Sequence, residues 1–167
     1  MSVSGTAIGV FEPDYSADAL IEIRADRGGH DAEAFVSDLL HMYRNFSKHQ
    51  GWRTEIVGQQ ETDGQHIKLV LLRVVGEGAY PKFKYETGRH RVQRVPKSEG
   101  QGRVHTSTAF VVVMPTPGER FRREVIRTYN FPEDEARDHR QKVKVAEVRR
   151  ILSGELDLIL SNLPDNG

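Results

Sequence analysis

The segment that most constrains the fold is an amphipathic stretch between Asp31 and Gly51. Its apolar side chains recur at intervals of three or four residues, which is the spacing of one face of an α-helix. Asp31 suits the positive N-terminal end of such a helix, and Gly51 is a typical C-terminal stop. A helix with a single apolar face needs an apolar surface to cover, so the remainder of the chain has to supply one. The apolar positions are Phe35, Leu39, Met42, Tyr43 and Phe46.

That surface is predicted to be a sheet. Alternating apolar residues predict a strand at residues 19–25, and a continuous apolar run predicts a buried strand at residues 108–114. Residues 52–57 and 66–75 predict two strands that flank a hairpin signal at residues 61–64. Shorter elements complete the pattern, with strands expected near residues 127–131 and 142–145 and helices near residues 146–152 and 156–163.

The order of these elements predicts an α+β fold, with a mixed, largely antiparallel sheet and helices packed on it. Residues 76–88 are turn-rich but contain an alternation at residues 82–85. No repeat, long linker or low-complexity tract interrupts the chain, so a single domain is predicted over residues 19–163. A lead-in at residues 1–18 and a short tail at residues 164–167 flank it.

Charge is unevenly distributed along the chain. The 167 residues carry 24 Lys+Arg and 24 Asp+Glu, for a formal net charge of zero. Taken alone, this balance argues against a basic nucleic-acid-binding protein. Residues 80–105, however, carry seven basic and two acidic side chains, whereas residues 1–79 carry seven basic and twelve acidic ones. A short, strongly basic segment therefore lies within a neutral average.

The hydrophobic periodicity disappears from His90 to His105, which predicts an exposed loop. Residues 88–108 supply Arg and Lys for phosphate contacts, Gln, Ser and Thr for base edges, and His for stacking on an unpaired base. Two interpretations fit this composition, an RNA-binding loop and a solvated basic loop. Gly28 and Gly29, which precede the predicted helix, likewise fit either an anion-binding turn or turn geometry alone.

The composition also excludes or disfavours several classes of function. The absence of cysteine excludes disulfides, cysteine-based zinc sites and thiol nucleophiles. The seven histidines do not show metal-ligand spacing, and Ser98 has no sequence-local base, so neither a metal or cofactor site nor a catalytic constellation is predicted. The sequence has no long apolar run and no secretory signal, which predicts a cytoplasmic protein that makes no membrane contact.

Two stretches around the basic segment resemble a known family. Residues 90–96 and 101–107 are similar to the codon-recognition domain of bacterial class I peptide chain release factors, of the type that reads UAA and UAG. The resemblance covers nearly the whole chain, residues 18–163, and it implies that the partners are the ribosome, an mRNA stop codon and ribosomal RNA. Further blocks agree in the same order, at residues 22–25 and 28–29, 42–43, 127–132 and 138–140.

The resemblance also implies roles for individual residues. Pro96, Lys97 and Ser98 occupy the tripeptide that reads the stop codon in the family, where Ser98 keeps the hydroxyl group of the usual threonine but lacks its methyl group. Gly28 and Asp31 match the family's helix-tip contact to the first base. The base-stacking role falls on His105, and the contacts to the third base fall on Gln93 and Thr106. Contacts to the RNA backbone are expected from Arg27, Arg89, Arg91, Arg94 and Arg103.

One large departure from the family is the absence of its hydrolytic part. In the family, a separate domain with a Gly-Gly-Gln motif hydrolyses peptidyl-tRNA, and it is inserted between the strand that ends near Pro115 and the block at residues 127–132. Here residues 115–126 bridge these two points, and the sequence contains no Gly-Gly-Gln. The family's N-terminal helical domain has no counterpart either. A natural paralogue and a deletion of the hydrolytic domain both fit this arrangement.

Two functions are favoured at this point, ahead of an enzyme of unrelated chemistry and of a structural paralogue that makes no ribosome contact. The first is stop-codon recognition in the ribosomal A site without peptidyl-tRNA hydrolysis, and hence without enzyme activity. The second is a codon-independent ribosome-binding or RNA-binding adaptor, or a rescue-type module that recruits a partner to supply hydrolysis. Lys97, Ser98, Arg27 and Arg89 motivate the second function, because added positive charge raises non-specific affinity for phosphate.

Overall fold

The computed structural model describes residues 18–114 and 125–163. The predicted tail, and almost all of the predicted lead-in and of the bridge at residues 115–126, lie outside these residues. In chain order the elements are β1 (Ala19–Ala25), α1 (Gly29–His49), β2 (Arg53–Glu61), β3 (Ile67–Val75), α2 (Ala79–Phe83), a 3-10 turn (Lys84–Glu86), β4 (Gly88–Arg94), β5 (His105–Met114), β6 (Val125–Asn130), β7 (Glu135–Asp138), β8 (Val143–Ala146), α3 (Val148–Ser153) and α4 (Asp157–Leu160).

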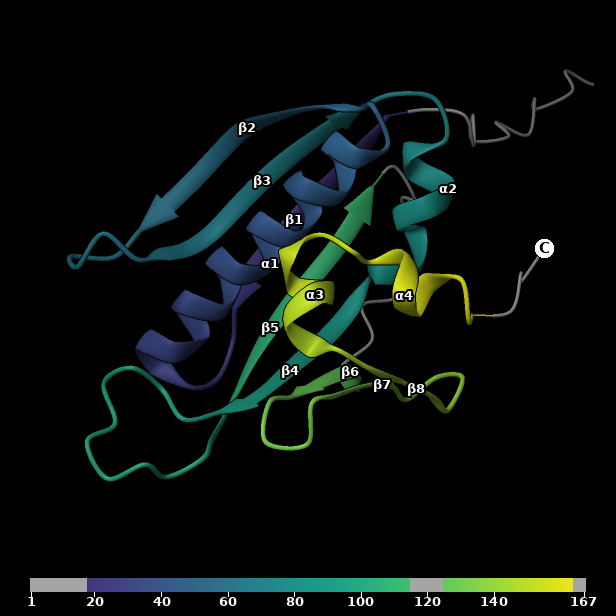
Figure 1. Cartoon of the computed structure of the whole chain (residues 1–167). Coiled ribbons are helices and arrows are strands. Elements are labelled where there is room, and N and C mark those ends of the chain that lie inside the picture. Colours follow the sequence, from purple (N-terminus) through teal and green to yellow (C-terminus); the bar gives the residue numbers. More distant parts are fainter. Residues whose placement is uncertain (1–17, 115–124, 164–167) are drawn as a thin grey trace, which may run out of the picture.

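The eight strands of the described residues form one sheet, in the order β2-β3-β1-β5-β4-β6-β7-β8 (Figure 1). Neighbouring strands are antiparallel, except that β4 and β6 run parallel. This arrangement confirms the predicted α+β fold with a mixed, largely antiparallel sheet. The strands predicted at residues 19–25 and 108–114 lie side by side in the middle of the sheet, as β1 and β5.

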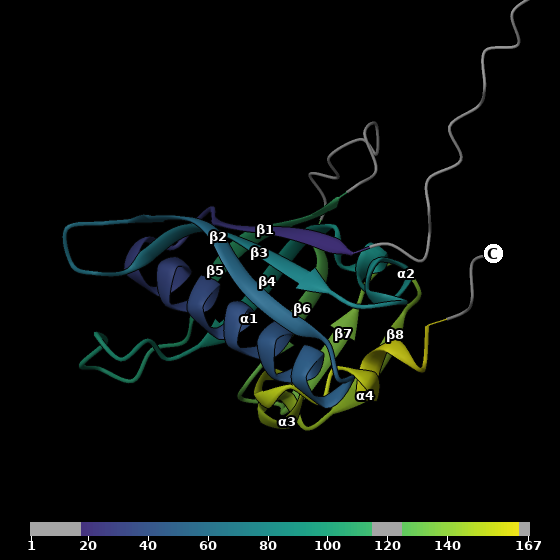
Figure 2. The ribbon, with the colours of Figure 1, turned by 90° about the horizontal axis from the view of Figure 1, so that it is seen from above.

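The sheet buries one face against α1, which lies across it (Figure 2). Along β1, β3 and β5 the side chains alternate, so that every second residue points toward the helix. The predicted helix positions Phe35, Leu39 and Tyr43 are fully buried in one apolar cluster with Ile23 and Leu72 of the sheet. Burial of a large apolar side chain stabilises a fold by roughly 1.5–3 kcal/mol. This packing therefore fixes the position of α1 and of its N-terminus.

The prediction of an exposed loop at residues 90–105 is wrong for the first of these residues. These residues begin within β4, a central strand that pairs with β5 on one side and with β6 on the other. Gly88, His90 and Val92 are buried and alternate with polar side chains that are only partly exposed. The period of a strand was hidden because a glycine and a histidine occupy two of the inward positions. The connection between β4 and β5 is confined to residues 95–104.

Three shorter elements, α2, β7 and α4, were either not predicted or predicted with other bounds. The alternation at residues 82–85 does not form a strand, because it lies in α2 and the 3-10 turn, where Phe83 is buried. Strand β7 was not predicted, since its four residues carry a single apolar side chain, Ala136. The helix predicted over residues 156–163 is shorter, because α4 covers only Asp157–Leu160.

A buried ion cluster joins the second half of the sheet to α1. The side chains of Arg127, Glu86 and Asp138 are fully buried, and Arg127 Nη2 lies 2.8 Å from Glu86 Oε1 and 3.1 Å from Asp138 Oδ2. The Tyr43 hydroxyl of α1 donates to Glu86 Oε2 at 2.7 Å, and Arg127 Nη1 donates to the Tyr129 hydroxyl at 3.2 Å. These five residues are called the Arg127 cluster below.

Neighbouring groups set the charge states within the Arg127 cluster. Arg140 donates two hydrogen bonds from its Nε and Nη2 to the two oxygens of Asp138, at 3.1 and 2.7 Å. Burial acts to raise the pKa of Asp138, but Arg140 and Arg127 outweigh it and lower that pKa to about 2. Burial also raises the pKa of Tyr43 well above its usual value. At neutral pH the cluster therefore contains an ionised Asp138 and a neutral Tyr43 phenol.

His90 is buried beside the same cluster. Its Nε2 lies 2.8 Å from the backbone oxygen of Glu86, so this nitrogen carries the proton, since a carbonyl oxygen only accepts. Burial is the largest influence on His90 and lowers its pKa to about 4, despite the nearby Glu86 carboxylate. The native protein therefore contains a neutral imidazole at this position at neutral pH.

Replacing Arg127 by Met should lower the free energy of unfolding by about 3–5 kcal/mol, because Glu86 and Asp138 would remain buried without their shared cation. Urea unfolding at pH 7 measures this loss. Arg137→Met is the matched control, since Arg137 lies on the neighbouring strand β7 and pairs with Glu135 while its side chain is 42% exposed. The control should cost no more than about 1 kcal/mol. Equal losses in the two variants would contradict the role given to the Arg127 cluster.

Stability should fall as the pH drops from about 6.5 toward about 4, because His90 takes up a proton in the unfolded chain but resists it in the native one. Between pH 7 and pH 5 this group removes about 2 kcal/mol from the free energy of unfolding. The neutral variant His90→Gln should show a correspondingly smaller loss over the same interval. The exposed His49→Gln serves as control and should change this loss less than His90→Gln does.

Candidate nucleic-acid interface

The predicted codon-reading residues gather where the N-terminus of α1 meets the connection between β4 and β5 (Figure 1). The turn between β1 and α1 is attached to β5 by backbone hydrogen bonds. The Thr108 amide donates to the Arg27 oxygen at 2.7 Å, and the Asp26 amide donates to the Thr108 oxygen at 2.9 Å. The Arg27 amide also donates to Thr108 Oγ1 at 3.1 Å. The helix tip is therefore held in a fixed position beside the start of β5.

Gly28 occupies a position that admits no side chain. It precedes α1 with φ 118°, in the left-handed region that favours glycine. A Cβ atom at this position would lie 2.2 Å from Ser107 Oγ and 2.6 Å from Ser107 Cβ. The buried Ser107 is itself fixed, because its hydroxyl donates to Asp31 Oδ2 at 2.9 Å. Gly28 thus lets the helix tip approach β5 closely, and its backbone stays exposed.

Asp31 connects the helix tip to β4 through Arg94. Arg94 Nε donates to Asp31 Oδ1 at 3.0 Å, and its Nη1 donates to Asp38 Oδ2 at 2.5 Å. Burial acts to lower the pKa of Arg94, but Asp38 and Asp31 outweigh it and raise that pKa. Because Ser107 engages the second oxygen of Asp31, both carboxylate oxygens already have a partner within the chain. Arg94 was predicted to contact RNA phosphate, and the structure places it between two carboxylates.

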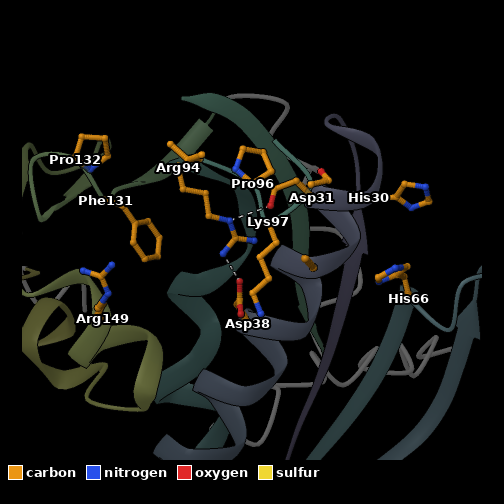
Figure 3. A pocket seen from close by; sticks show the side chains of 13 residues that line it. His30, Asp31, Asp38, His66, Arg94, Pro96, Lys97, Phe131, Pro132 and Arg149 are labelled. Atoms are coloured by element: carbon orange, nitrogen blue, oxygen red, sulfur yellow. Dashed lines mark hydrogen bonds and ion pairs between the residues drawn. The ribbon is translucent and has the colours of Figure 1, made fainter. Parts of the chain in front are cut away.

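The predicted tripeptide lies at the rim of an open groove of about 820 Å³. Pro96 is buried, whereas Lys97 and Ser98 are exposed at a turn, which is closed by a hydrogen bond of 3.0 Å from the Glu99 amide to the Pro96 oxygen. Figure 3 shows Phe131 and Arg149 along one side of the groove and His30 and His66 along the other. The full lining is His30, Asp31, Ala34, Asp38, His66, Arg94, Val95, Pro96, Lys97, Ser98, Phe131, Pro132 and Arg149.

Glu99 organises the rest of this connection, and sequence reasoning did not single it out. Its Oε1 accepts a hydrogen bond from the Gln101 amide at 2.8 Å, and its Oε2 lies 2.8 Å from His105 Nε2. Arg103 Nε lies 3.8 Å from the same oxygen. The Gln101 amide and then His105 lower the pKa of Glu99. The available signal was the single carboxylate among the basic residues of the 88–108 stretch. A count of charges uses such a residue only to reduce the net charge.

The remaining predicted base contacts lie at the strand ends next to this connection. Gln93 on β4 is paired in register with Thr106 on β5, and the adjacent pair joins Arg94 and His105. His105 and Thr106 are exposed, and Gln93 is partly buried. The structure therefore brings the third-base candidates together, beside the groove but outside its lining.

The predicted phosphate contacts divide into two groups. Arg89 lies 3.4 Å from Asp26 Oδ2 and sits over the Phe110 ring at 4.6 Å, Arg94 is paired as above, and Arg103 faces Glu99. Arg27 and Arg91 make no ion pair with a carboxylate in the described part of the chain. Charge alone did not distinguish the two groups, because a sequence shows which residues are basic but not which of them have a partner.

Residues 18–114 and 125–163 contain neither a metal-binding cluster nor a membrane-spanning helix. No group of three or more His, Asp or Glu side chains there is arranged to hold a metal ion. None of the helices in these ranges combines the length and the hydrophobicity needed to cross a membrane.

Comparison with protein families decides the relationship of the chain. Residues 8–111 match the family model described as the PCRF domain. The chain belongs to the PCRF domain family. The matched residues of the PCRF domain include the helix tip, β4 and the whole connection from β4 to β5, and therefore every residue predicted to read the codon.

Individual relatives of this PCRF domain protein are similar over somewhat less than two thirds of the chain. Peptide chain release factor 1 of Latilactobacillus sakei subsp. sakei (strain 23K) is 47% identical over 104 residues, which is 62% of this chain and 28% of the relative. Peptide chain release factor 1 of Desulfitobacterium hafniense (strain DSM 10664 / DCB-2) is 45% identical over 108 residues, which is 65% of this chain and 30% of the relative. The chain thus spans less than a third of the length of these relatives.

The structure of RF2 of Thermus thermophilus has a similar fold, with a TM-score of 0.80. The similarity covers 90% of this chain and 68% of that chain at 20% sequence identity. It therefore shows a shared fold that extends beyond the residues matched by the PCRF domain.

Replacing Gly28 by Ala should destabilise the chain more than replacing Gly29 by Ala. Both residues have positive φ, and a left-handed alanine costs about 1–2 kcal/mol. Only Gly28→Ala also forces a Cβ against Ser107, which adds about 1–3 kcal/mol of overpacking, whereas a Cβ on Gly29 meets nothing within 4 Å. Urea unfolding of the two variants measures the difference, and equal losses would show that the approach to Ser107 is not constrained.

Proposed function

We propose that this chain recognises stop codons in the ribosomal A site, in the manner of a release factor that reads UAA and UAG, without hydrolysing peptidyl-tRNA itself. The observation that carries the proposal is the presence of one exposed surface built from the helix tip, the Pro96–Ser98 turn and the strand ends at His105 and Thr106. Membership of the PCRF domain family and the names of the relatives, peptide chain release factor 1, support it.

The chemistry of this surface suits unpaired RNA bases. Sequence-specific reading of RNA uses exposed hydroxyl, amide and ring groups that reach the edges and faces of unstacked bases. Ser98, Thr106 and Gln93 supply such hydroxyl and amide groups, and His105 supplies an exposed ring. The carboxylate of Glu99 orients the His105 ring, so a base that stacks on it meets a prepositioned partner. Gly28 adds exposed backbone at the helix tip.

The second half of the proposal concerns catalysis. The sequence contains no Gly-Gly-Gln tripeptide, the motif through which the release-factor family is expected to hydrolyse peptidyl-tRNA. Residues 115–126 stand where that family inserts its hydrolytic domain. We therefore expect the chain to occupy the A site at stop codons without releasing the peptide, and to compete there with a complete release factor.

A codon-independent adaptor, of the kind that could act in ribosome rescue with a partner supplying hydrolysis, is the second candidate. It is favoured by the cations near the surface that make no ion pair with a carboxylate in the described residues, namely Lys97, Arg27 and Arg91. Positive charge of this kind binds phosphate regardless of sequence and depends strongly on salt. Ser98, which lacks the methyl group of threonine, is consistent with reduced selectivity.

Binding to ribosomes programmed with UAA, UAG, UGA or a sense codon in the A site distinguishes the two functions. Stop-codon reading predicts tighter binding to UAA and UAG than to the sense codon, whereas an adaptor binds all four alike. A peptide-release assay on the same complexes tests the catalytic half. Release of peptide by this chain alone would contradict the proposed lack of hydrolysis.

Replacing Ser98 by Thr should raise the ratio of stop-codon to sense-codon affinity by a factor of roughly 3–10, because the added methyl group restricts the hydroxyl to fewer rotamers beside the first two bases. The programmed-ribosome assay measures the ratio. Thr106→Ser is a matched control that removes a methyl group at the third-base position, and it should not raise the ratio. An adaptor that does not read codons would show no change in either variant.

A further inference from the structure

The exposed side of α1 carries a second groove, away from the surface just described. This α1 groove has a volume of about 600 Å³ and lies between the second half of the helix and the start of β2. We propose that it binds the phosphate backbone of RNA, independently of the codon. The residues that line it are Ser37, Leu40, His41, Arg44, Asn45, Lys48, Trp52 and Thr54.

The charge of the α1 groove is of one sign. Its lining includes three basic residues and no carboxylate. Arg44 and Lys48 are exposed, and their side chains make no hydrogen bond or ion pair with another described residue. Elsewhere in the described chain, by contrast, many arginines are neutralised locally, as Arg73 is by Asp18 at 3.0 Å and Arg150 is by Glu147 and Glu155. The α1 groove therefore presents positive charge that the fold does not use.

The helix dipole explains only part of this charge. A cation in the last turn of a helix is favoured by the partial negative charge of the C-terminal carbonyl groups, and Lys48 is such a residue. The effect fades within that turn. Arg44 and His41 lie one and two turns earlier, so stabilisation of the helix end does not account for them.

Asn45 determines which ring nitrogen of neutral His41 carries the proton. Asn45 Nδ2 donates to the Ser153 oxygen at 2.9 Å, which identifies that atom as the amide nitrogen. The same nitrogen lies 2.9 Å from His41 Nε2, which must accept. Neutral His41 therefore carries its proton on Nδ1, a donor available to a phosphate oxygen. His41, Arg44 and Lys48 thus give the groove three side chains that can donate to phosphate, and no carboxylate lines it.

Trp52 and Leu40 give the α1 groove its shape. Leu40 is almost fully buried. The Trp52 indole donates a hydrogen bond of 3.1 Å to the Glu77 oxygen and makes an edge contact with the Phe46 ring and a tilted contact with the Phe83 ring. Proteins that bind single-stranded nucleic acid combine such an apolar wall with basic side chains. The sugar or base lies against the wall, and the phosphates lie against the cations.

One stripe of α1 connects the α1 groove to the reading surface, the exposed surface formed by the helix tip, the Pro96–Ser98 turn, His105 and Thr106. Ala34 and Asp38 line the groove beside the Pro96–Ser98 turn, and His41, Asn45 and Lys48 continue the same stripe of the helix at intervals of three or four residues. From Ala34 to Lys48 this stripe is about 21 Å long, at 1.5 Å per residue. An RNA strand that passes the reading surface can thus follow α1 into the second groove. The inference goes beyond the proposed function, because this contact does not depend on the codon.

Salt-dependent binding of the full chain to a fluorescent oligouridylate, which contains no stop triplet, tests the inference by fluorescence anisotropy between about 50 and 200 mM salt. The double variant Arg44→Gln and Lys48→Gln should make the slope of log K against log salt shallower by about 1.4, since each phosphate contact on a single strand contributes about 0.7. The double variant Arg53→Gln and Lys142→Gln removes two exposed cations outside the groove and should leave the slope unchanged.

Three outcomes would overturn the inference. The first is an unchanged slope in the variant that lacks Arg44 and Lys48, and the second is an equal reduction in the Arg53 and Lys142 variant. The third concerns polyglutamate. If the variant that lacks Arg44 and Lys48 loses binding to polyglutamate as much as it loses binding to oligouridylate, the groove is a surface for acidic protein. Equal urea midpoints of all chains establish that folding is unaffected.

The programmed-ribosome assay separates this inference from the proposed function. Loss of Arg44 and Lys48 should weaken binding to stop-codon and sense-codon ribosomes by the same factor, leaving their ratio unchanged. A ratio of one in the parent chain would contradict stop-codon reading while leaving the oligouridylate result intact. A ratio that falls in the variant would instead show that the α1 groove takes part in reading the codon, which would contradict its proposed independence.

Discussion

The buried guanidinium of Arg127 joins parts of the chain that apolar packing alone would not align. Its partners come from the 3-10 turn (Glu86), from β7 (Asp138), from β6 itself (Tyr129) and, through Glu86, from α1 (Tyr43). Burying a charge costs several kcal/mol unless every partner is in place. The first half of the sheet is ordered by alternating apolar side chains, whereas the position of β6 and β7 relative to α1 depends on these directional contacts.

The reading surface is held in place by contacts of its own. Its helix tip is attached to β5 by backbone hydrogen bonds at Thr108, and the absence of a side chain at Gly28 lets it lie close to Ser107. The ion pair between Asp31 and Arg94 connects it to β4. Each of these contacts uses a polar group near the surface to fix the backbone, which leaves Ser98, His105 and Thr106 exposed. Binding groups held in place before the ligand arrives lose less conformational entropy when they bind.

Sequence patterns predicted the parts of the fold that depend on apolar periodicity. Helix α1, β1 and β5 follow from it, because large apolar residues occupy their inward positions. Strand β4 was mistaken for a loop, because Gly88 and His90 face the core there. The ion pairs could not be predicted, since Arg127 and Arg94 look like other basic residues until their carboxylate partners, far away in sequence, are known. The family resemblance named the candidate site residues, and in the structure they lie at one end of the molecule. The contacts of Glu99 and the α1 groove could be recognised only from the structure.

The parallel pairing of β4 with β6 has a topological consequence. Strand β5 runs antiparallel to β4, and β6 runs parallel to it. The last residue of β5 and the first residue of β6 therefore lie toward the same end of the strands, with only β4 between them. Val125 lies level with Phe110, four residues before the end of β5 at Met114. At about 4.8 Å per strand and 3.3 Å per residue, the two points are therefore roughly 16 Å apart. A connection of about five residues is long enough to close this gap, and longer ones cost little more because loop-closure entropy changes only slowly with length. Material can therefore be gained or lost at this junction during evolution while every strand keeps its neighbours.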